Sequence, residues 1–242
     1  MKELVLKILA VLFLIWLIAA LLITGMRLLP DHEEKDEEPD KQTEEVVEQK
    51  PVFKDDYVLY RFEQLKEMNP DFTGKLQVGQ LIYECVVKST DNFDYLEKNL
   101  EMRPYGEGTV FMDYQNELDH HNLILYGHTI YSDETLRFGP LHQLKNQDQL
   151  EKNHQILFEL ENETRIYEIV CVMHFDLNSD IDYAKTEYTE EEMNQYISYI
   201  NEHNLIQTDQ QITSQDYLLT LQTDVKDNPD VKLIVVAKQV NR

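Results

Sequence analysis

The chain has 242 residues, of which 42% are hydrophobic and 10% aromatic, so it has room for one domain with a substantial core plus appendages. The formal net charge of −24 argues against nucleic acid as a partner, because like charges repel and no counterions would be released. The only two cysteines, Cys85 and Cys171, lie in strand-like apolar runs. We interpret them as small buried hydrophobes, with a disulfide between them left open. No C-x-x-C pair supports a zinc site.

The N-terminus carries an uncharged apolar run at residues 8–25, which reaches a membrane-spanning length once the preceding apolar residues are included and Lys7 snorkels. Lys2 and Lys7 precede the run and acidic residues follow it, so the N-terminus is expected in the cytoplasm and the rest outside the cell. The run is too long for a cleaved signal peptide, and no A-x-A site follows it. We therefore predict a retained signal anchor, a single transmembrane helix, over residues 1–28.

An acidic stretch follows the predicted anchor. Residues 31–50 contain ten Asp or Glu and three Lys, with almost no apolar side chains to offset the entropy of ordering. We predict a solvated linker over residues 29–52, with a partly helical stalk as the alternative. The globular domain is then expected over residues 53–242.

Within this domain, apolar spacing predicts a helix over residues 57–68 that ends before Pro70. Strands are expected at residues 74–78, 81–87, 108–113, 122–126, 155–160, 166–175, 218–224 and 231–238. Two short helices are expected at residues 93–99 and 140–145. A further helix is expected to start after an N-cap at Thr189. Its apolar side comprises Met193, Tyr196, Ile197, Ile200 and Leu205. Many short strands with few helices predict a mixed, mainly antiparallel barrel.

Two strand ends carry residues of the kinds that take part in binding or catalysis. The last two strands form a hairpin that ends one strand on Asp224 and begins the next near Lys232, and these charges are either a loop ion pair or one side of a site. The strand over residues 122–126 runs into Gly127 and His128, where glycine is expected to let the backbone bend and aim the histidine out of the sheet. Apolar side chains downstream are expected to pack beneath it: Leu136, Phe138, Leu141 and Leu144.

Several segments, in order along the chain, resemble the class B sortases of Gram-positive bacteria. They are residues 65–74 (LKEMNPDFTG), 108–114 (GTVFMDY), 123–129 (LILYGHT), 138–141 (FGPL), 217–223 (YLLTLQT) and 233–238 (LIVVAK). The resemblance covers residues 62–242 and implies an eight-stranded sortase barrel on the outer face of the membrane, with an N-terminal helical segment. A helix between the sixth and seventh strands is also implied, and the helix after Thr189 matches it.

The resemblance also implies a chemistry. In the family, a cysteine thiolate cleaves a sorting signal and forms a thioacyl enzyme that an amine resolves, while a histidine serves as acid and base and an arginine steadies the substrate. Carried over by position, the histidine is His128. Asp224 occupies the position of the cysteine, Lys232 that of the arginine, and Thr223 is a candidate binding residue. Neither Cys85 nor Cys171 is near these segments in sequence. No cofactor or metal is implied.

A carboxylate is a far weaker nucleophile toward an amide than a thiolate, and lysine cannot form the planar bidentate fork of arginine. We therefore predict a pseudo-sortase that is membrane-anchored, faces the cell wall and binds a sorting-signal peptide, another sortase or a surface protein. A charge-balanced site of Asp224, Lys232 and His128 is expected to raise the pKa of His128. The connection after the sixth strand is strongly acidic, and no peptide motif follows from it.

Three alternatives remain open. Asp224 and His128 could hydrolyse an ester or an activated acyl group without a cysteine. The adjacent His120 and His121 could bind a metal with His128 and Asp224. The chain could also be an altered copy of a working transpeptidase that anchors proteins to the cell wall.

Overall fold

The computed structural model describes residues 56–241, all within the compact unit Gln49–Arg242. The predicted anchor over residues 1–28 and the acidic linker over residues 29–52 lie outside the described residues. Between residues 56 and 241, no helix is both long and apolar enough to cross a membrane.

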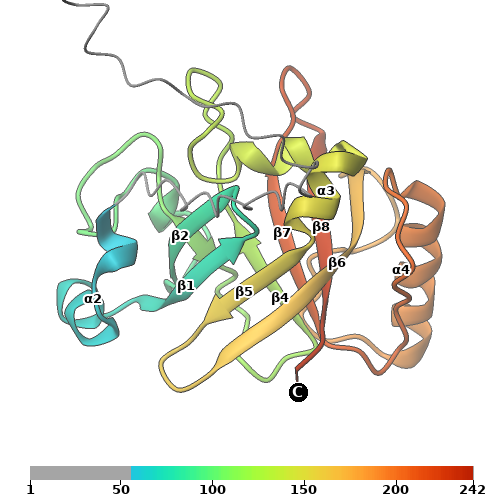
Figure 1. Ribbon diagram of the computed structural model, residues 1–242, viewed down its shortest axis with the longest axis horizontal. Coiled ribbons are helices and arrows are strands. Elements are labelled where there is room, and N and C mark those ends of the chain that lie inside the picture. Colours follow the sequence, from blue (N-terminus) through green and yellow to red (C-terminus); the bar gives the residue numbers. More distant parts are fainter. Residues whose placement is uncertain (1–55, 242) are drawn as a thin grey trace, which may run out of the picture. The chain divides into compact units, whose positions relative to one another are not determined.

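Eight strands close into a barrel in the order β1-β2-β3-β4-β7-β8-β6-β5 (Figure 1). They are β1 (Phe72–Val78), β2 (Ile82–Val87), β3 (Val110–Met112), β4 (Asn122–Tyr126), β5 (Gln155–Glu159), β6 (Thr164–Asp176), β7 (Leu218–Asp224) and β8 (Val231–Gln239). Neighbouring strands are antiparallel except in the pairs β2–β3 and β4–β7, which are parallel. The predicted mixed, mainly antiparallel barrel is confirmed, and each expected strand lies within two residues of the observed one.

The helices differ more from expectation. The predicted helix over residues 57–68 is two pieces, the 3₁₀ helix η1 (Asp56–Leu59) and α2 (Phe62–Met68). The short helices η2 (Asp94–Leu96) and η3 (Gly139–Lys145) are also 3₁₀. The structure adds α3 (Gln147–Asn153), which the sequence analysis did not predict; the Asn146 side chain caps it by accepting from the Gln149 amide.

The helix in the connection between β6 and β7 is α4 (Glu190–His203), and it begins as predicted after Thr189. The Thr189 hydroxyl accepts from the Glu192 amide while the Glu192 carboxylate accepts from the Thr189 amide, which is a complete capping box. Met193, Tyr196 and Ile200 on this side are buried, and Ile197 is partly buried. Leu205 is a correction, because the helix ends at His203 and Leu205 lies beyond its C-cap Asn204, 49% exposed.

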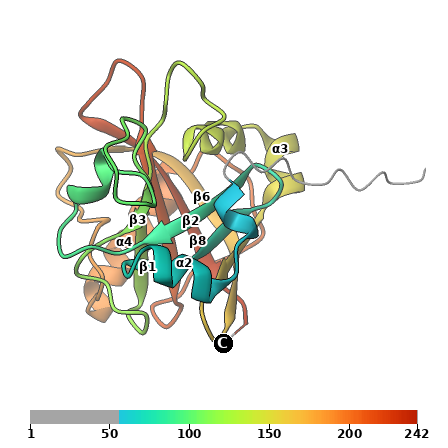
Figure 2. The same ribbon diagram turned by 90° about the vertical axis from the view of Figure 1, so that its left-hand side faces the viewer.

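Alternation along β7 and β8 sends side chains to two different cores. Leu221 and Val235 point into the barrel interior, which is filled by a large apolar cluster. Ile234 points outward and packs with Met193 and other residues of α4, which covers this side of the barrel (Figures 1 and 2). Asp224 and Lys232 fall on the outward face, so the same pattern that builds the core also sets both charges on the outside of the barrel wall.

Candidate functional site

His128 follows the end of β4, and a buried aromatic ring lies under the turn that presents it. At Gly127 a Cβ atom would lie 2.7 Å from the Phe138 ring, so the glycine is needed for this close approach. Gly127 is not among the positive-φ glycines, so the close approach of the Phe138 ring, rather than an unusual backbone conformation, is what requires a glycine here. Phe138 is fully buried with Leu141 and Leu144, as predicted, whereas Leu136 is only partly buried.

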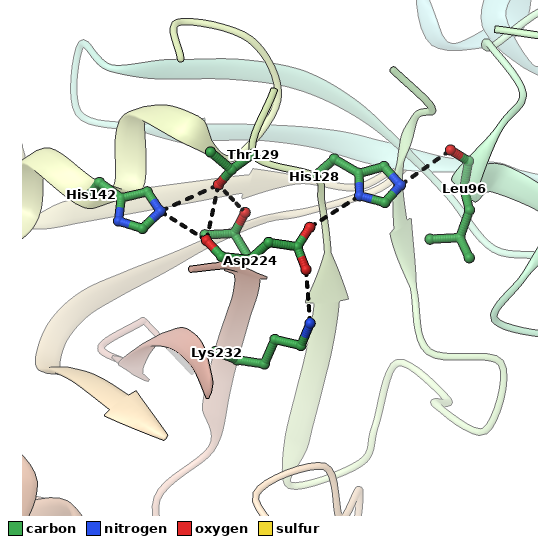
Figure 3. Close-up of polar contacts among 7 residues, drawn as sticks. Leu96, His128, Thr129, His142, Asp224 and Lys232 are labelled. Atoms are coloured by element: carbon green, nitrogen blue, oxygen red, sulfur yellow. Dashed lines mark hydrogen bonds and ion pairs between the residues drawn. The ribbon is translucent and has the colours of Figure 1, made fainter. Parts of the chain in front are cut away.

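The structure brings the three predicted charged residues together (Figure 3). Asp224 ends β7 and Lys232 lies directly opposite it on β8. Asp224 Oδ1 is 2.8 Å from Lys232 Nζ, and Asp224 Oδ2 is 3.2 Å from His128 Nδ1. The side chains of His128 and Asp224 are about one-third exposed, at 33% and 35%, so solvent and a ligand can reach them. The two charges on the hairpin are therefore one side of a three-residue site rather than an isolated loop pair.

Two acceptors favour the protonated form of His128. Its Nδ1 faces the Asp224 carboxylate, and its Nε2 is 3.2 Å from the Leu96 carbonyl in η2. A neutral imidazole can donate from only one nitrogen, whereas the imidazolium donates from both. The hydrogen bond to Asp224 raises the pKa of His128 above its ordinary value and outweighs the opposing effect of burial. This is the direction expected from the sequence.

Asp224 is the complementary anion. Hydrogen bonds from His128 and Lys232 lower its pKa to about 2, against the opposing effect of burial. A carboxylate with so low a pKa is weakly basic and is therefore a poor nucleophile and a poor general base at neutral pH. Each of its oxygens is already engaged, one with His128 and one with the Lys232 ammonium group.

A second hydrogen-bond network supports the Asp224 backbone from inside the barrel. The Thr129 hydroxyl lies 2.7 Å from the Thr223 hydroxyl and donates to the Asp224 carbonyl at 3.3 Å. His142 Nε2 donates to the same carbonyl at 2.9 Å (Figure 3). Burial lowers the pKa of His142, with nearby Lys145 acting in the same direction, so the pKa values of His142 and His128 move in opposite directions.

Thr223 takes a different place from the one expected of a binding residue. Its side chain is 1% exposed and bonds Thr129, so it braces the strand end, and its role in binding stays a prediction. Thr129, His142 and the Leu96 carbonyl were not predicted as site groups. Thr129 lies next to His128 in the motif of residues 123–129, but no sequence pattern indicated that His142 would lie near β7.

The two cysteines are buried and form no disulfide with each other. Burial raises the pKa of the Cys171 thiol to about 12, so the thiolate needed for nucleophilic attack is scarcely populated. Cys85 lies on β2 and packs in an apolar cluster with Leu65 and Phe72. Neither residue joins the site.

The histidines proposed as extra metal ligands lie at the other end of β4. His121 precedes this strand, pairs with Glu187 at 2.6 Å between Nδ1 and Oε2, and stacks on Tyr217. His120 Nδ1 accepts from the Glu117 amide. Across residues 56–241, no group of three or more His, Cys, Asp or Glu side chains is placed to hold a metal ion.

Comparisons with known proteins agree with this architecture. No family model matches the chain. The sortase B of Staphylococcus aureus is 29% identical over 189 residues, 76% of each chain, and the sortase B of Listeria monocytogenes is 25% identical over 185 residues, 74% of this chain and 73% of the relative.

Solved structures give the same result. The sortase B of Clostridium perfringens superposes with a TM-score of 0.68 at 27% identity, covering 74% of this chain and 99% of that one. A substrate complex of the S. aureus sortase B has a TM-score of 0.67 at 26% identity, covering 74% of this chain and 84% of that one. In both sequence and structure, the chain is therefore similar to proteins named sortase B.

Proposed function

We propose that the chain is a pseudo-sortase: a class B sortase-like protein that keeps the barrel and a peptide-binding surface but lacks transpeptidase chemistry. One observation carries the proposal, namely that Asp224 lies ion-paired between His128 and Lys232. The family motif places a cysteine at this position and an arginine at Lys232. The present trio keeps one anion beside a lysine cation and a histidine whose pKa is raised, and the anion is a carboxylate.

The chemistry of a carboxylate explains the loss of activity. Attack of Asp224 on a peptide carbonyl would give a mixed anhydride and an amine. From the tetrahedral intermediate the carboxylate leaves far more readily than the amine, because its conjugate acid has a pKa of about 2. The intermediate therefore returns to substrate. Losing the nucleophile of such a site typically lowers kcat by several powers of ten.

A surface for a bound segment remains beside His128. An open hollow of about 540 Å³ is lined by the apolar residues Phe93, Leu96, Met102 and Pro104 together with the charged residues Asp94, Glu97 and Lys98. Phe93 is 76% exposed and Met102 49% exposed, which is unusual for large apolar side chains with nothing covering them. We propose that this hollow and the charged site bind a sorting-signal peptide or a partner sortase. The protein would lie outside the cell, facing the cell wall and held by its N-terminal apolar run as a single-pass anchor.

Peptide turnover and peptide binding separate this proposal from its alternatives. We expect the ectodomain to bind a sorting-signal peptide, measured by fluorescence anisotropy, and to cleave none of a quenched panel when triglycine is supplied as the amine. Phe93→Ser should weaken binding without changing the fold. Failure to bind any peptide or any sortase would remove the binding role.

Restoring the family residues tests whether the peptide-binding groove is still intact. Asp224→Cys, and more so Asp224→Cys with Lys232→Arg, should gain cleavage and transfer to triglycine, while the same variant with His128→Ala should not. Gain of activity means that only the chemistry has changed. Turnover by the unmodified protein that disappears in both Asp224→Asn and His128→Ala would instead support a cysteine-independent hydrolase.

A further inference from the structure

Arg137 is a buried cation that lies outside the charged trio. It is 5% exposed, and its Nη1 is 2.8 Å from Glu84 Oε2 on β2, a carboxylate that is itself 8% exposed. Its Nε donates to the Gly108 carbonyl at 2.9 Å. Breaking a buried pair of this kind leaves an uncompensated charge, so both partners are held in place.

The backbone of Arg137 closes the loop that follows His128. Arg137 has a φ of 49°, in the left-handed region that non-glycine residues rarely adopt. It forms an isolated antiparallel bridge with Thr129, and the amide of the next residue, Phe138, donates to the His128 carbonyl at 3.1 Å. The position of Arg137 therefore fixes the backbone on which His128 stands.

The other contact of Arg137 fixes the acceptor of the same histidine. Gly108, whose carbonyl binds Arg137 Nε, has a φ of +61° and packs so closely that a Cβ would lie 2.6 Å from the Leu96 carbonyl oxygen. That oxygen is the partner of His128 Nε2. Displacement of Gly108 would thus move the Leu96 carbonyl.

We infer that Arg137, anchored by Glu84, is a positioning residue that holds His128 and the Leu96 carbonyl in register with each other. The hydrogen bond to Asp224, burial, the Leu96 carbonyl and the charge of Lys232 act directly on the pKa of His128. Arg137 reaches His128 through its backbone bridge to Thr129 and through its contact with the Gly108 carbonyl, so we expect its effect to pass through geometry. The inference concerns the geometry of the site and is independent of its proposed function.

The test is an NMR titration of His128 in the full chain. In Arg137→Gln we expect the His128 pKa to fall and the Nε2 proton to exchange faster, because the Leu96 acceptor is no longer held. Arg137→Lys keeps the charge but cannot bridge Glu84 and Gly108 with a planar fork, so it should show the same change in a smaller amount. Arg165→Gln removes an equal charge from a pair with Glu163 on another part of the barrel and should leave the titration unchanged.

A purely structural role would give a different result. If folded Arg137→Gln has a lower melting temperature but keeps the wild-type His128 titration, the inference is overturned, as it is if Arg165→Gln lowers the His128 pKa equally. Should Arg137→Gln not fold, Glu84→Gln and Arg137→Lys carry the same test. A wild-type titration in both would reject the positioning role. Because no peptide is involved, the outcome is separate from the binding and turnover assays.

Discussion

Asp224 and Lys232 face each other across the β7–β8 pair and join at 2.8 Å, while the second oxygen of Asp224 turns to His128. The carboxylate thus links a strand-borne lysine to a histidine carried by another segment. The site therefore weakens at low pH, where Asp224 becomes protonated, and at high pH, where His128 loses its proton.

The stability contribution of this trio should be greatest in mildly acidic solution. The pKa of Asp224 is lowered to about 2, so its contribution is present above its ordinary pKa and is lost as the pH falls toward 2. The pKa of His128 is raised, so its contribution is present below its ordinary pKa and is lost as the pH rises through the raised value. Asp224→Asn should cost about 1 kcal/mol near pH 5.5, allowing for solvent screening of a one-third-exposed pair, and much less near pH 2.

Denaturant unfolding at these two pH values checks this expectation. Asp230→Asn, an exposed change of the same charge near the start of β8, serves as the control and should have little effect at either pH. An equal loss of stability for Asp224→Asn at both pH values would contradict the assigned ion pair.

Removing Lys232 should move two pKa values in the same direction for different reasons. In Lys232→Met the pKa of Asp224 rises because a donor and a positive charge are lost. The pKa of His128 also rises, because Lys232 repels the imidazolium in the wild-type protein. Lys232→Arg, which keeps the charge, should leave both close to wild type. Carbon-13 and nitrogen-15 NMR titrations measure the two groups separately, and a fall in the His128 pKa of Lys232→Met would show that this repulsion is absent.

The hydrogen-bonded hydroxyls of Thr129 and Thr223 beside the Asp224 carbonyl should behave as a coupled unit. Thr223→Val removes a hydroxyl that lies 2.7 Å from the Thr129 hydroxyl and leaves a buried polar partner unsatisfied, at a cost of about 1–3 kcal/mol. Thr129→Val should cost more, because its hydroxyl also donates to the Asp224 carbonyl. The double variant should be less destabilised than the sum of the single ones. Additive losses in denaturant unfolding would show that the two hydroxyls act independently.

Some features of the fold and the site could be predicted from the sequence and others could not, for physical reasons. Alternation placed Leu221 and Asp224 on opposite faces of one strand, because a strand has a period of two. The charged trio could be predicted because His128 lies within a family motif and Asp224 and Lys232 lie directly beside two others, at strand ends. His142 could not, because its contact with Asp224 spans 82 residues and depends on how η3 packs against the barrel. The buried pair of Glu84 and Arg137 could not be predicted either, because the two residues lie far apart in the sequence and meet only through tertiary packing.

Helices were less predictable than strands. α3 has seven residues, too few for a periodic apolar pattern to stand out. The break between η1 and α2 follows the backbone of Arg61, which is extended while its amide donates to the Gln64 side chain. Apolar spacing across this break matched a single helix, so the pattern alone could not show the interruption.

Close packing behind the site leads to a final prediction, at Gly127. An added methyl group in Gly127→Ala would lie 2.7 Å from the Phe138 ring, and Phe138 is fully buried, so the ring has little room to move. We expect a loss of about 1–3 kcal/mol, as for overpacking in other cores, together with displacement of His128. Gly106→Ala is the matched control, since nothing lies within 4 Å of its added Cβ. Denaturant unfolding should separate the two variants, and NMR should show the His128 titration altered only in Gly127→Ala. Equal stability of both variants would mean that the turn before His128 tolerates a side chain, and that Phe138 does not constrain the site.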